Sequence, residues 1–463
     1  MKGNRLKRSS KPSGKSEAWR SRDRKVLWHP FTQQLLWMDE DFPVIVRGKG
    51  ATLVDADGRE YLDGVSSLWC NIHGHARPEL NGALKRQLDR VSHATFLGVT
   101  NPPAIELAER LVDLAPEGLS RVFYSDNGST AVEIALKMAF QYWQQNGQAR
   151  RTKFVTLDAG YHGDTVGAVS VGGIELFHGV FKPLLFRTIK APATYAYRCD
   201  RARNLEECGQ HCIVDIEAIL RTHAHEVAAM IVEPLIQGAG GMITQPRGFL
   251  TGLRHLCDKY GVLLIADEVM TGFGRTGRMF ACEHEGITPD LLAISKGITG
   301  GYLPLAATLA TEKIYKGFLG DFKDRRTFYH GHTYTGNPLA CAAALASLDL
   351  FRKEKLLEKV RKKIHDLGNL LQDFYLIEQV GDIRTCGLVA GIELVADPKT
   401  KAPYPVEQRM GHRVALEARK RGALLRPLGD TVVLMPPLSI TDRELKLLVD
   451  IAVDSVRAAV GPS

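Results

Sequence analysis

Short apolar runs alternate with helical stretches in the middle of the chain. Each run has four to six residues and ends in small or polar residues. The runs are RVFY (121–124), KFVTL (153–157), VAAMIV (227–232), VLLIA (262–266) and LLAI (291–294). Segments with helical spacing of apolar residues lie between them, for example 131–143 and 248–260. This alternation predicts an α/β fold with a mostly parallel central sheet covered on both faces.

The two flanks of the chain have a different pattern. Residues 43–63 are typical of a β-meander, with a tight turn at Asp57-Gly58. Residues 355–463 mix charged helical segments with short strands at 388–394 and 431–434. We therefore expect a large domain from residues 67–345. A small α+β domain is expected from both chain ends, residues 26–66 and 346–463.

The positive charge of the chain is confined to its first residues. Residues 1–25 hold ten Lys or Arg and two acids, so their net charge of +8 equals that of all 463 residues. This segment has few apolar side chains to bury, which predicts a disordered basic tail. The remainder is neutral overall, so we expect no nucleic-acid partner for the fold itself.

No feature of the sequence indicates secretion, a membrane or a metal. The chain has no signal-like apolar run and no stretch of about 18 apolar residues that would span a bilayer. Its eight cysteines are scattered, and the cluster of Cys199, Cys208, His211 and Cys212 does not match zinc-site spacing. We expect a cytoplasmic protein with reduced thiols, no membrane association and no metal.

Residues that can carry chemistry follow three of the predicted strands, where open α/β sheets bind their ligands. Gly128 and Ser129 stand at the start of a helix, where they would either bind phosphate or cap the helix. Asp267 follows a buried strand and needs a cationic or donor partner, such as a protonated pyridine. Lys296 follows the next strand, and an apolar setting would lower the pKa of its amine, as Schiff-base chemistry requires.

Two further loops complete the set of candidate residues. Tyr161, in the sequence GYHG, either stacks on a cofactor ring or packs in the core. The polar loop 331–338 either holds phosphate or caps the Ala-rich helix that follows. A phosphate-binding turn, an aromatic plate, a buried acid and a strand-end lysine together indicate a site for pyridoxal 5′-phosphate (PLP).

These residues resemble those of the class III (fold type I) PLP-dependent aminotransferases. The specific signature is IADEVMTGFGRTG followed by PDLLAISKGITGG. From residue 26 onward the chain is most similar to the 7,8-diaminopelargonate aminotransferases of biotin biosynthesis, in segments that include LWHPFT, FQYW and GYHGDT. The resemblance implies ping-pong transfer of an amino group to 8-amino-7-oxononanoate, giving 7,8-diaminononanoate.

The resemblance also implies roles for single residues. Lys296 would form the Schiff base with PLP and move a proton, and Asp267 would keep the pyridine nitrogen protonated. Gly128 and Ser129 would hold the phosphate, and Tyr161 would stack on the ring. These positions match the motifs of the family one by one.

Other matched positions concern the subunit partner and the substrates. His332 and Thr333 would reach the cofactor of the other subunit, which implies a homodimer with shared active sites. Substrate-binding positions are matched by Trp69, Tyr161, Gly331 and Arg426. Of these, Arg426 is the candidate for the substrate carboxylate, because a guanidinium pairs with it through two hydrogen bonds.

The sequence leaves the amino donor open between S-adenosylmethionine and L-lysine. Members that use S-adenosylmethionine usually carry a tandem Trp where this chain has Leu68-Trp69, a Tyr in place of Phe31 and an aromatic residue near Val433. The SSLW…NIHGH version is similar to a subgroup with lysine as donor. A broader ω-amino acid or amine aminotransferase is the alternative function. A non-catalytic protein that binds nucleic acid through its tail is disfavoured by the intact Lys296 and Asp267.

Overall fold

A seven-stranded sheet forms the centre of the computed structural model, which describes residues 14–461. Its order is β4 (Leu119–Ser125), β12 (Ala306–Thr311), β11 (Leu291–Ile294), β10 (Leu263–Asp267), β7 (Val227–Val232), β5 (Lys153–Leu157) and β6 (Ile189–Ala191). The five strands from β11 to β6 are parallel, whereas β12 runs antiparallel to both of its neighbours. The predicted α/β fold with a mostly parallel sheet is confirmed.

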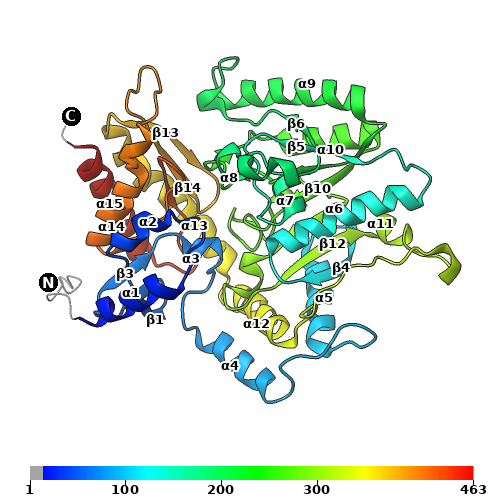
Figure 1. Cartoon of the computed structure of the whole chain (residues 1–463), viewed down its shortest axis with the longest axis horizontal. Helices are drawn as coiled ribbons and strands as arrows, with labels where there is room; N and C mark the ends of the chain where they lie inside the picture. Colours follow the sequence, from blue (N-terminus) through cyan, green and yellow to red (C-terminus); the bar gives the residue numbers. More distant parts are fainter. Residues whose placement is uncertain (1–13, 462–463) are drawn as a thin grey trace.

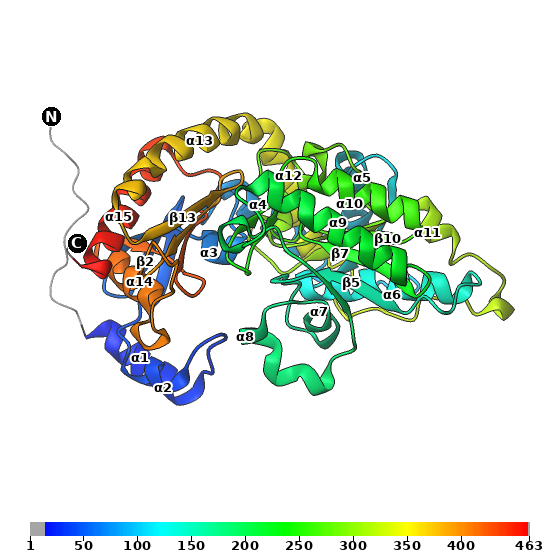
Figure 2. The same cartoon turned by 90° about the horizontal axis from the view of Figure 1, so that it is seen from above.

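Helices cover both faces of this sheet (Figures 1 and 2). The helix α6 (Gly128–Gln145) lies on one face, and α5 (Pro102–Leu114), α9 (Leu205–His223), α10 (Phe249–Tyr260) and α12 (Pro338–Lys353) lie on the other. Successive side chains of a strand point to opposite faces, so Leu264 packs in the α9 and α10 layer while Ile265 packs against the α6 layer. Burial on both sides explains why these strands read as continuous apolar runs.

The two ends of the chain meet beside this central layer (Figure 1). A four-stranded sheet contains β1 (Ile45–Lys49), β2 (Thr52–Asp55), β3 (Glu60–Asp63) and β15 (Ala423–Leu424). A second sheet contains β13 (Val380–Thr385), β14 (Ala390–Leu394) and β16 (Thr431–Leu434), with α13 (Leu356–Leu370), α14 (Met410–Lys420) and α15 (Asp442–Val460) in the same part of the chain. Domain boundaries near residues 66 and 346 remain a prediction.

The expected disorder of residues 1–25 is wrong for residues 15–25, which lie in the helix α1 (Lys15–Val26). Residues 1–13 are outside the described part of the chain. The buried Arg20 pairs with Asp41, and its Nε donates a 2.8 Å hydrogen bond to the carbonyl oxygen of Phe42. The basic side chains of this helix thus have acidic and aromatic partners beyond the tail itself, and these partners stabilise an ordered conformation.

Residues 14–461 contain neither a membrane-spanning helix nor a metal-binding cluster of side chains. No helix in this range has the length and apolar character needed to cross a membrane. No group of three His, Cys, Asp or Glu side chains in the same range is placed to hold a metal ion. All eight cysteines are free.

Candidate active site

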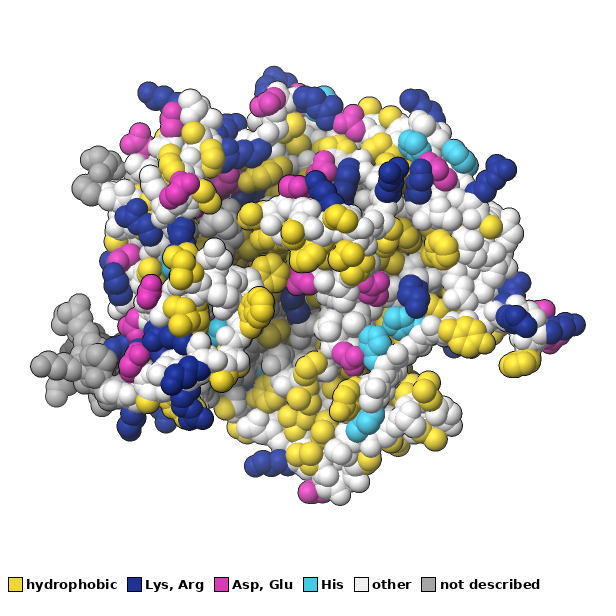
Figure 3. All heavy atoms as spheres, in the orientation of Figure 1, with side chains coloured by type: hydrophobic (Ala, Val, Ile, Leu, Met, Phe, Trp, Pro, Cys, Tyr) yellow, Lys and Arg dark blue, Asp and Glu magenta, His cyan; other side chains and the backbone are white. Residues whose placement is uncertain are grey.

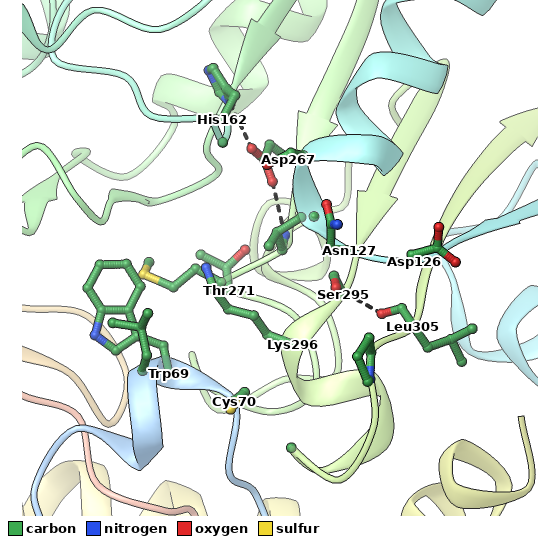
Figure 4. A pocket seen from close by; sticks show the side chains of 18 of the residues that line it. Trp69, Cys70, Asp126, Asn127, His162, Asp267, Thr271, Ser295, Lys296 and Leu305 are labelled. Carbon is green, nitrogen blue, oxygen red and sulfur yellow. Dashed lines mark hydrogen bonds and ion pairs between the residues drawn. The ribbon is translucent and has the colours of Figure 1, made fainter. Parts of the chain in front are cut away.

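A cavity of about 480 Å³ opens where the carboxyl ends of the parallel strands meet the segment around residue 69. Figure 3 shows the hollow between the two parts of the molecule, and Figure 4 shows the side chains that line it. A cavity of this size suits a cofactor together with a small substrate. It is lined by six of the residues predicted from the sequence, namely Trp69, Gly128, Ser129, Tyr161, Asp267 and Lys296.

Asp267 is the last residue of β10, and its carboxylate is 5% exposed. Its Oδ2 lies 2.7 Å from Nδ1 of His162, and its Oδ1 accepts a 3.1 Å hydrogen bond from the backbone N–H of Val269 (Figure 4). A carboxylate so deeply buried is stable only beside cationic or donor groups. His162 supplies one such partner, and the cavity leaves room for a second beside the same carboxylate.

Lys296 follows β11 and begins the short helix η4 (Lys296–Thr299) with a φ of 44°, in the left-handed region that side chains other than glycine seldom adopt. Burial lowers the pKa of its amine, while the negative charges of Asp267 and Glu233 partly oppose this shift. The Nζ atom lies 5.0 Å from the centre of the Trp69 ring. Within residues 14–461 this amine forms no ion pair, so it is available inside the cavity.

The start of α6 combines a capped helix with free N–H groups. Asn127 is the N-cap: its side chain accepts a 3.1 Å hydrogen bond from the N–H of Thr130, and Thr130 Oγ1 accepts one from the N–H of Asn127. The N–H groups of Gly128 and Ser129 have no partner within the helix, and free N–H groups at a helix N-terminus favour a negatively charged ligand. A Cβ atom on Gly128 would come within 2.6 Å of Val269, so only glycine fits there. Capping therefore involves Asn127 and Thr130 and does not use the N–H groups of Gly128 and Ser129.

Tyr161 forms one wall of the cavity and is held from two sides. Its hydroxyl donates a 2.8 Å hydrogen bond to Asp164, and its backbone N–H donates one of 2.9 Å to Glu233. Behind it, the ring of His178 is stacked at a centroid distance of 6.2 Å. Burial raises the pKa of the Tyr161 hydroxyl above its usual range, so the group remains a neutral hydrogen-bond donor.

The sequence interpretation missed two residues of this site, His162 and Glu233. Glu233 accepts hydrogen bonds from the N–H groups of Tyr161 at 2.9 Å and Gly238 at 2.8 Å. Burial raises its pKa to about 7. Both residues follow the ends of predicted strands, so the same strand-end rule that selected Asp267 and Lys296 could have found them.

Four predicted residues do not line this cavity: Gly331, His332, Thr333 and Arg426. Gly331 and Thr333 are exposed in the loop before α12. His332 reaches toward the site only indirectly, because its Nδ1 lies 2.8 Å from Asp126, which does line the cavity. Arg426 is exposed between β15 and β16.

The fold and this cavity define an enzyme of the aminotransferase class, and the chain belongs to the class-III aminotransferase family, whose model matches residues 37–456. The adenosylmethionine-8-amino-7-oxononanoate aminotransferase of Geobacter sulfurreducens is 55% identical over 451 residues, which cover 97% of this chain and 100% of that protein. The enzyme of the same name from Methanocaldococcus jannaschii is 47% identical over 454 residues, or 96% and 98% of the two chains.

Solved structures agree with this assignment. The crystal structure of the Methanocaldococcus jannaschii enzyme has a TM-score of 0.91 at 46% identity and covers 95% of this chain and 98% of that one. An amine transaminase from an uncultivated Pseudomonas species, solved with PLP bound, has a TM-score of 0.90 at 40% identity and covers 94% and 99%. Dependence on PLP is a general property of this family.

Proposed function

We propose that this protein is a PLP-dependent aminotransferase of biotin biosynthesis that converts 8-amino-7-oxononanoate into 7,8-diaminononanoate. The observation that carries the proposal is the presence of Lys296 and Asp267 in one cavity of a chain that is 55% identical to an enzyme named for this substrate. The alternative function is that of another ω-amino acid or amine aminotransferase. This alternative is supported by the similar structure of the amine transaminase from a Pseudomonas species.

The residues of the cavity fit PLP. Asp267 offers a buried carboxylate for the pyridine nitrogen, and Tyr161 offers an aromatic face. Gly128 and Ser129 offer free N–H groups and a hydroxyl for the phosphate. A Cβ atom on Gly163 would lie 2.0 Å from Ser129 Oγ, so the backbone around this phosphate-binding position leaves no space for a larger residue. The amine of Lys296 would bond to the aldehyde carbon of the cofactor.

Each of these side chains has a task in the transfer. When bound, PLP takes up the electrons that are released as a proton leaves the carbon bearing the substrate's amino group. Lys296 accepts that proton and returns it, and burial favours the neutral amine that this step needs by lowering the pKa of the amine. Asp267 would hold a negative charge beside the pyridine nitrogen, and His162 fixes the orientation of that carboxylate.

Substrate binding involves the wall opposite Lys296 and a second subunit. Trp69 is buried, and its Nε1 has no hydrogen-bond partner within residues 14–461, so it can donate to a substrate. We propose a homodimer in which Gly331, His332 and Thr333 serve the partner's cavity, since they do not line their own. Arg426 is proposed to bind the substrate carboxylate, and its guanidinium forms no ion pair in the described part of the chain.

We propose S-adenosylmethionine as the amino donor, in line with the names of the relatives, and L-lysine as the alternative. Phe31 supports the alternative because it presents no hydroxyl to a nucleoside. Its ring contacts Phe177 edge to face at 5.3 Å, and Phe177 in turn contacts Tyr161 at 6.4 Å. The segment that contains Phe31 thus approaches the cavity wall, as Figure 2 shows for the chain before α2 (Gln34–Asp39) and the helix α8 (Glu175–His178).

The test is a spectral titration of the purified enzyme with PLP. Each donor is added separately without an acceptor, and bleaching of the visible band of the bound cofactor identifies the donor. Adding 8-amino-7-oxononanoate is then expected to restore the band, while Lys296→Ala shows no such band at the start. Bleaching by simple ω-amines alone, with no recovery on adding the keto acid, would favour the alternative function.

A further inference from the structure

Four side chains connect α6, the loop before α12 and the edge of the cavity. The Nζ atom of Lys137 lies 2.9 Å from Nδ1 of His330. The Nε2 atom of His330 lies 3.1 Å from Nε2 of His332. The Nδ1 atom of His332 lies 2.8 Å from Oδ2 of Asp126, which directly precedes the N-cap of α6. We call the four side chains of Lys137, His330, His332 and Asp126 the histidine relay.

The hydrogen-bonding chemistry gives the relay a single direction. A lysine ammonium has only donors, so Nδ1 of His330 accepts and the ring proton of His330 is on Nε2. Nε2 of His332 then accepts from His330, which places the proton of His332 on Nδ1. This Nδ1 is held by charge proximity, since it lies 2.8 Å from Asp126 Oδ2 without forming a hydrogen bond within residues 14–461. Burial, Lys137 and His332 lower the pKa of His330, while Glu133 opposes them, so His330 is neutral as this order requires.

Packing keeps the relay in this arrangement. The ring of His330 is stacked on Phe328 at 5.7 Å with an interplanar angle of 14°, and Phe123 contacts it edge to face at 6.4 Å. The amide of Gln141, one turn beyond Lys137 on α6, donates a 3.1 Å hydrogen bond to the carbonyl oxygen of Thr327. The loop is therefore attached to α6 at two successive turns.

The loop does not serve the cavity of its own chain. Thr333 is exposed, and neither it nor His332 lines that cavity. Asp126, at the other end of the relay, does line it and stands next to the proposed phosphate-binding turn. One ordered series of side chains thus joins a chain's own phosphate-binding turn to a loop directed away from it.

We propose that Lys137 and His330 are positioning residues that act on the partner's active site: they fix His332 and Thr333 in the orientation in which these residues contact the partner's cofactor. This inference rests on the proposed homodimer with shared sites. Neither positioning residue lines the cavity of its own chain. A substitution of Lys137 should therefore weaken PLP binding in the cavity of the neighbouring subunit.

The experiment compares PLP affinity and activity in mixed dimers. Lys137→Met removes the donor, and Lys137→Arg is the matched control because arginine also donates to His330. The side chain of Lys137 is exposed, so neither change disturbs the core. In homodimers we expect PLP to bind roughly tenfold more weakly to K137M, and within about twofold of wild type to K137R, as for the loss or retention of one charge-assisted hydrogen bond.

In a mixed dimer, the cavity of the chain that carries Lys296→Ala is inactive. The signal therefore comes from the cavity of the other chain, which is the working cavity. In a dimer of K137M with K296A, the working cavity belongs to the K137M chain and receives an intact loop, so its PLP affinity is expected to equal that of wild type. In a dimer of the double variant K137M/K296A with wild type, the working cavity receives the altered loop, and the tenfold loss is expected. The opposite pattern, or no effect of K137M, overturns the inference. A wild-type protein that is monomeric or binds no PLP instead contradicts the proposed function.

Discussion

Nδ1 of His162 lies 2.7 Å from Oδ2 of Asp267 in the wall of the cavity, although the two residues are 105 apart in the sequence. His162 comes from the loop after β5 and Asp267 from the end of β10, on the far side of β7 in the central sheet. The carboxylate is thereby held by two groups, the imidazole and the N–H of Val269. The orientation of Asp267 is thus fixed before any cofactor binds.

Asp267→Asn is expected to lower kcat/KM by about 100-fold or more, because an amide has the shape of the carboxylate but not the charge that stabilises a protonated pyridine. PLP should still bind, with an altered visible spectrum. His162→Gln is the comparison, with a loss of about tenfold, because it affects only the orientation of Asp267. Equal activity of D267N and wild type would contradict the role of the charge.

Lys296→Ala is expected to abolish transamination without lowering the melting temperature of the PLP-free protein. The amine is buried without an ion pair in the described part of the chain, and burial lowers its pKa, so its removal relieves a cost of desolvation. Differential scanning calorimetry on the two PLP-free proteins measures this. A clear fall in the melting temperature of K296A would show that Lys296 has a structural role.

Arg275→Met is expected to destabilise the fold by about 3 kcal/mol, because it leaves buried acceptors unpaired. Arg275 is 1% exposed, and burial lowers its pKa to about 9. Its guanidinium donates hydrogen bonds to the carbonyl oxygens of Pro436 at 2.7 Å and Leu388 at 3.3 Å, and to the hydroxyl of Ser66 at 3.2 Å. Urea denaturation gives the difference, and R275K, which keeps the charge with fewer donors, should lose less.

The acid stability of the protein should depend on His73. This residue is buried with Nε2 at 3.0 Å from Ser347 Oγ, and burial lowers its pKa from 6.5 to about 4. The unfolded chain therefore binds a proton at His73 between these two values while the folded chain does not, so stability falls as the pH drops from about 6.5 to 4.

His73→Gln keeps a hydrogen-bonding group but does not titrate, so it should remove part of this pH dependence. The lowering of the His73 pKa from 6.5 to about 4 corresponds to a loss of about 3 kcal/mol in the free energy of unfolding over this pH range. Urea denaturation at pH 7 and pH 4.5 checks the prediction. Parallel pH profiles of wild type and H73Q would exclude a neutral, buried His73.

The sequence was sufficient for those parts of the fold and site that depend on local pattern. Buried strands produce continuous apolar runs, and the central sheet, Asp267 and Lys296 followed from these runs and from the strand-end rule. The helix α1 could not be predicted in this way, because its stability depends on Asp41 and Phe42, which lie outside the basic segment. The antiparallel direction of β12 also has no signal in the strand itself, whose residues are buried like those of the parallel strands.

Contacts between distant segments were equally beyond sequence patterns. The histidine relay requires that Lys137 of α6 and His330 of a later loop meet, and neither residue carries a local signature of the other. For the loop 331–338 the sequence allows either phosphate binding or helix capping. In the structure Asn337 performs the capping of α12, accepting a 3.0 Å hydrogen bond from the N–H of Ala340. Residues 331–333, at the start of the loop, do not cap the helix, which is consistent with their proposed contact with the partner subunit.

The pairing of β3 with β15 has a consequence for synthesis on the ribosome. Leu62 is the register partner of Ala423, so the first sheet of the chain is completed only when almost all of the protein has been translated. Until then β3 has an unpaired edge, while the seven-stranded sheet already has every one of its strands once residue 311 has emerged. Nascent chains that stop short of residue 423 should therefore be the species that most need a chaperone, because an open strand edge promotes aggregation.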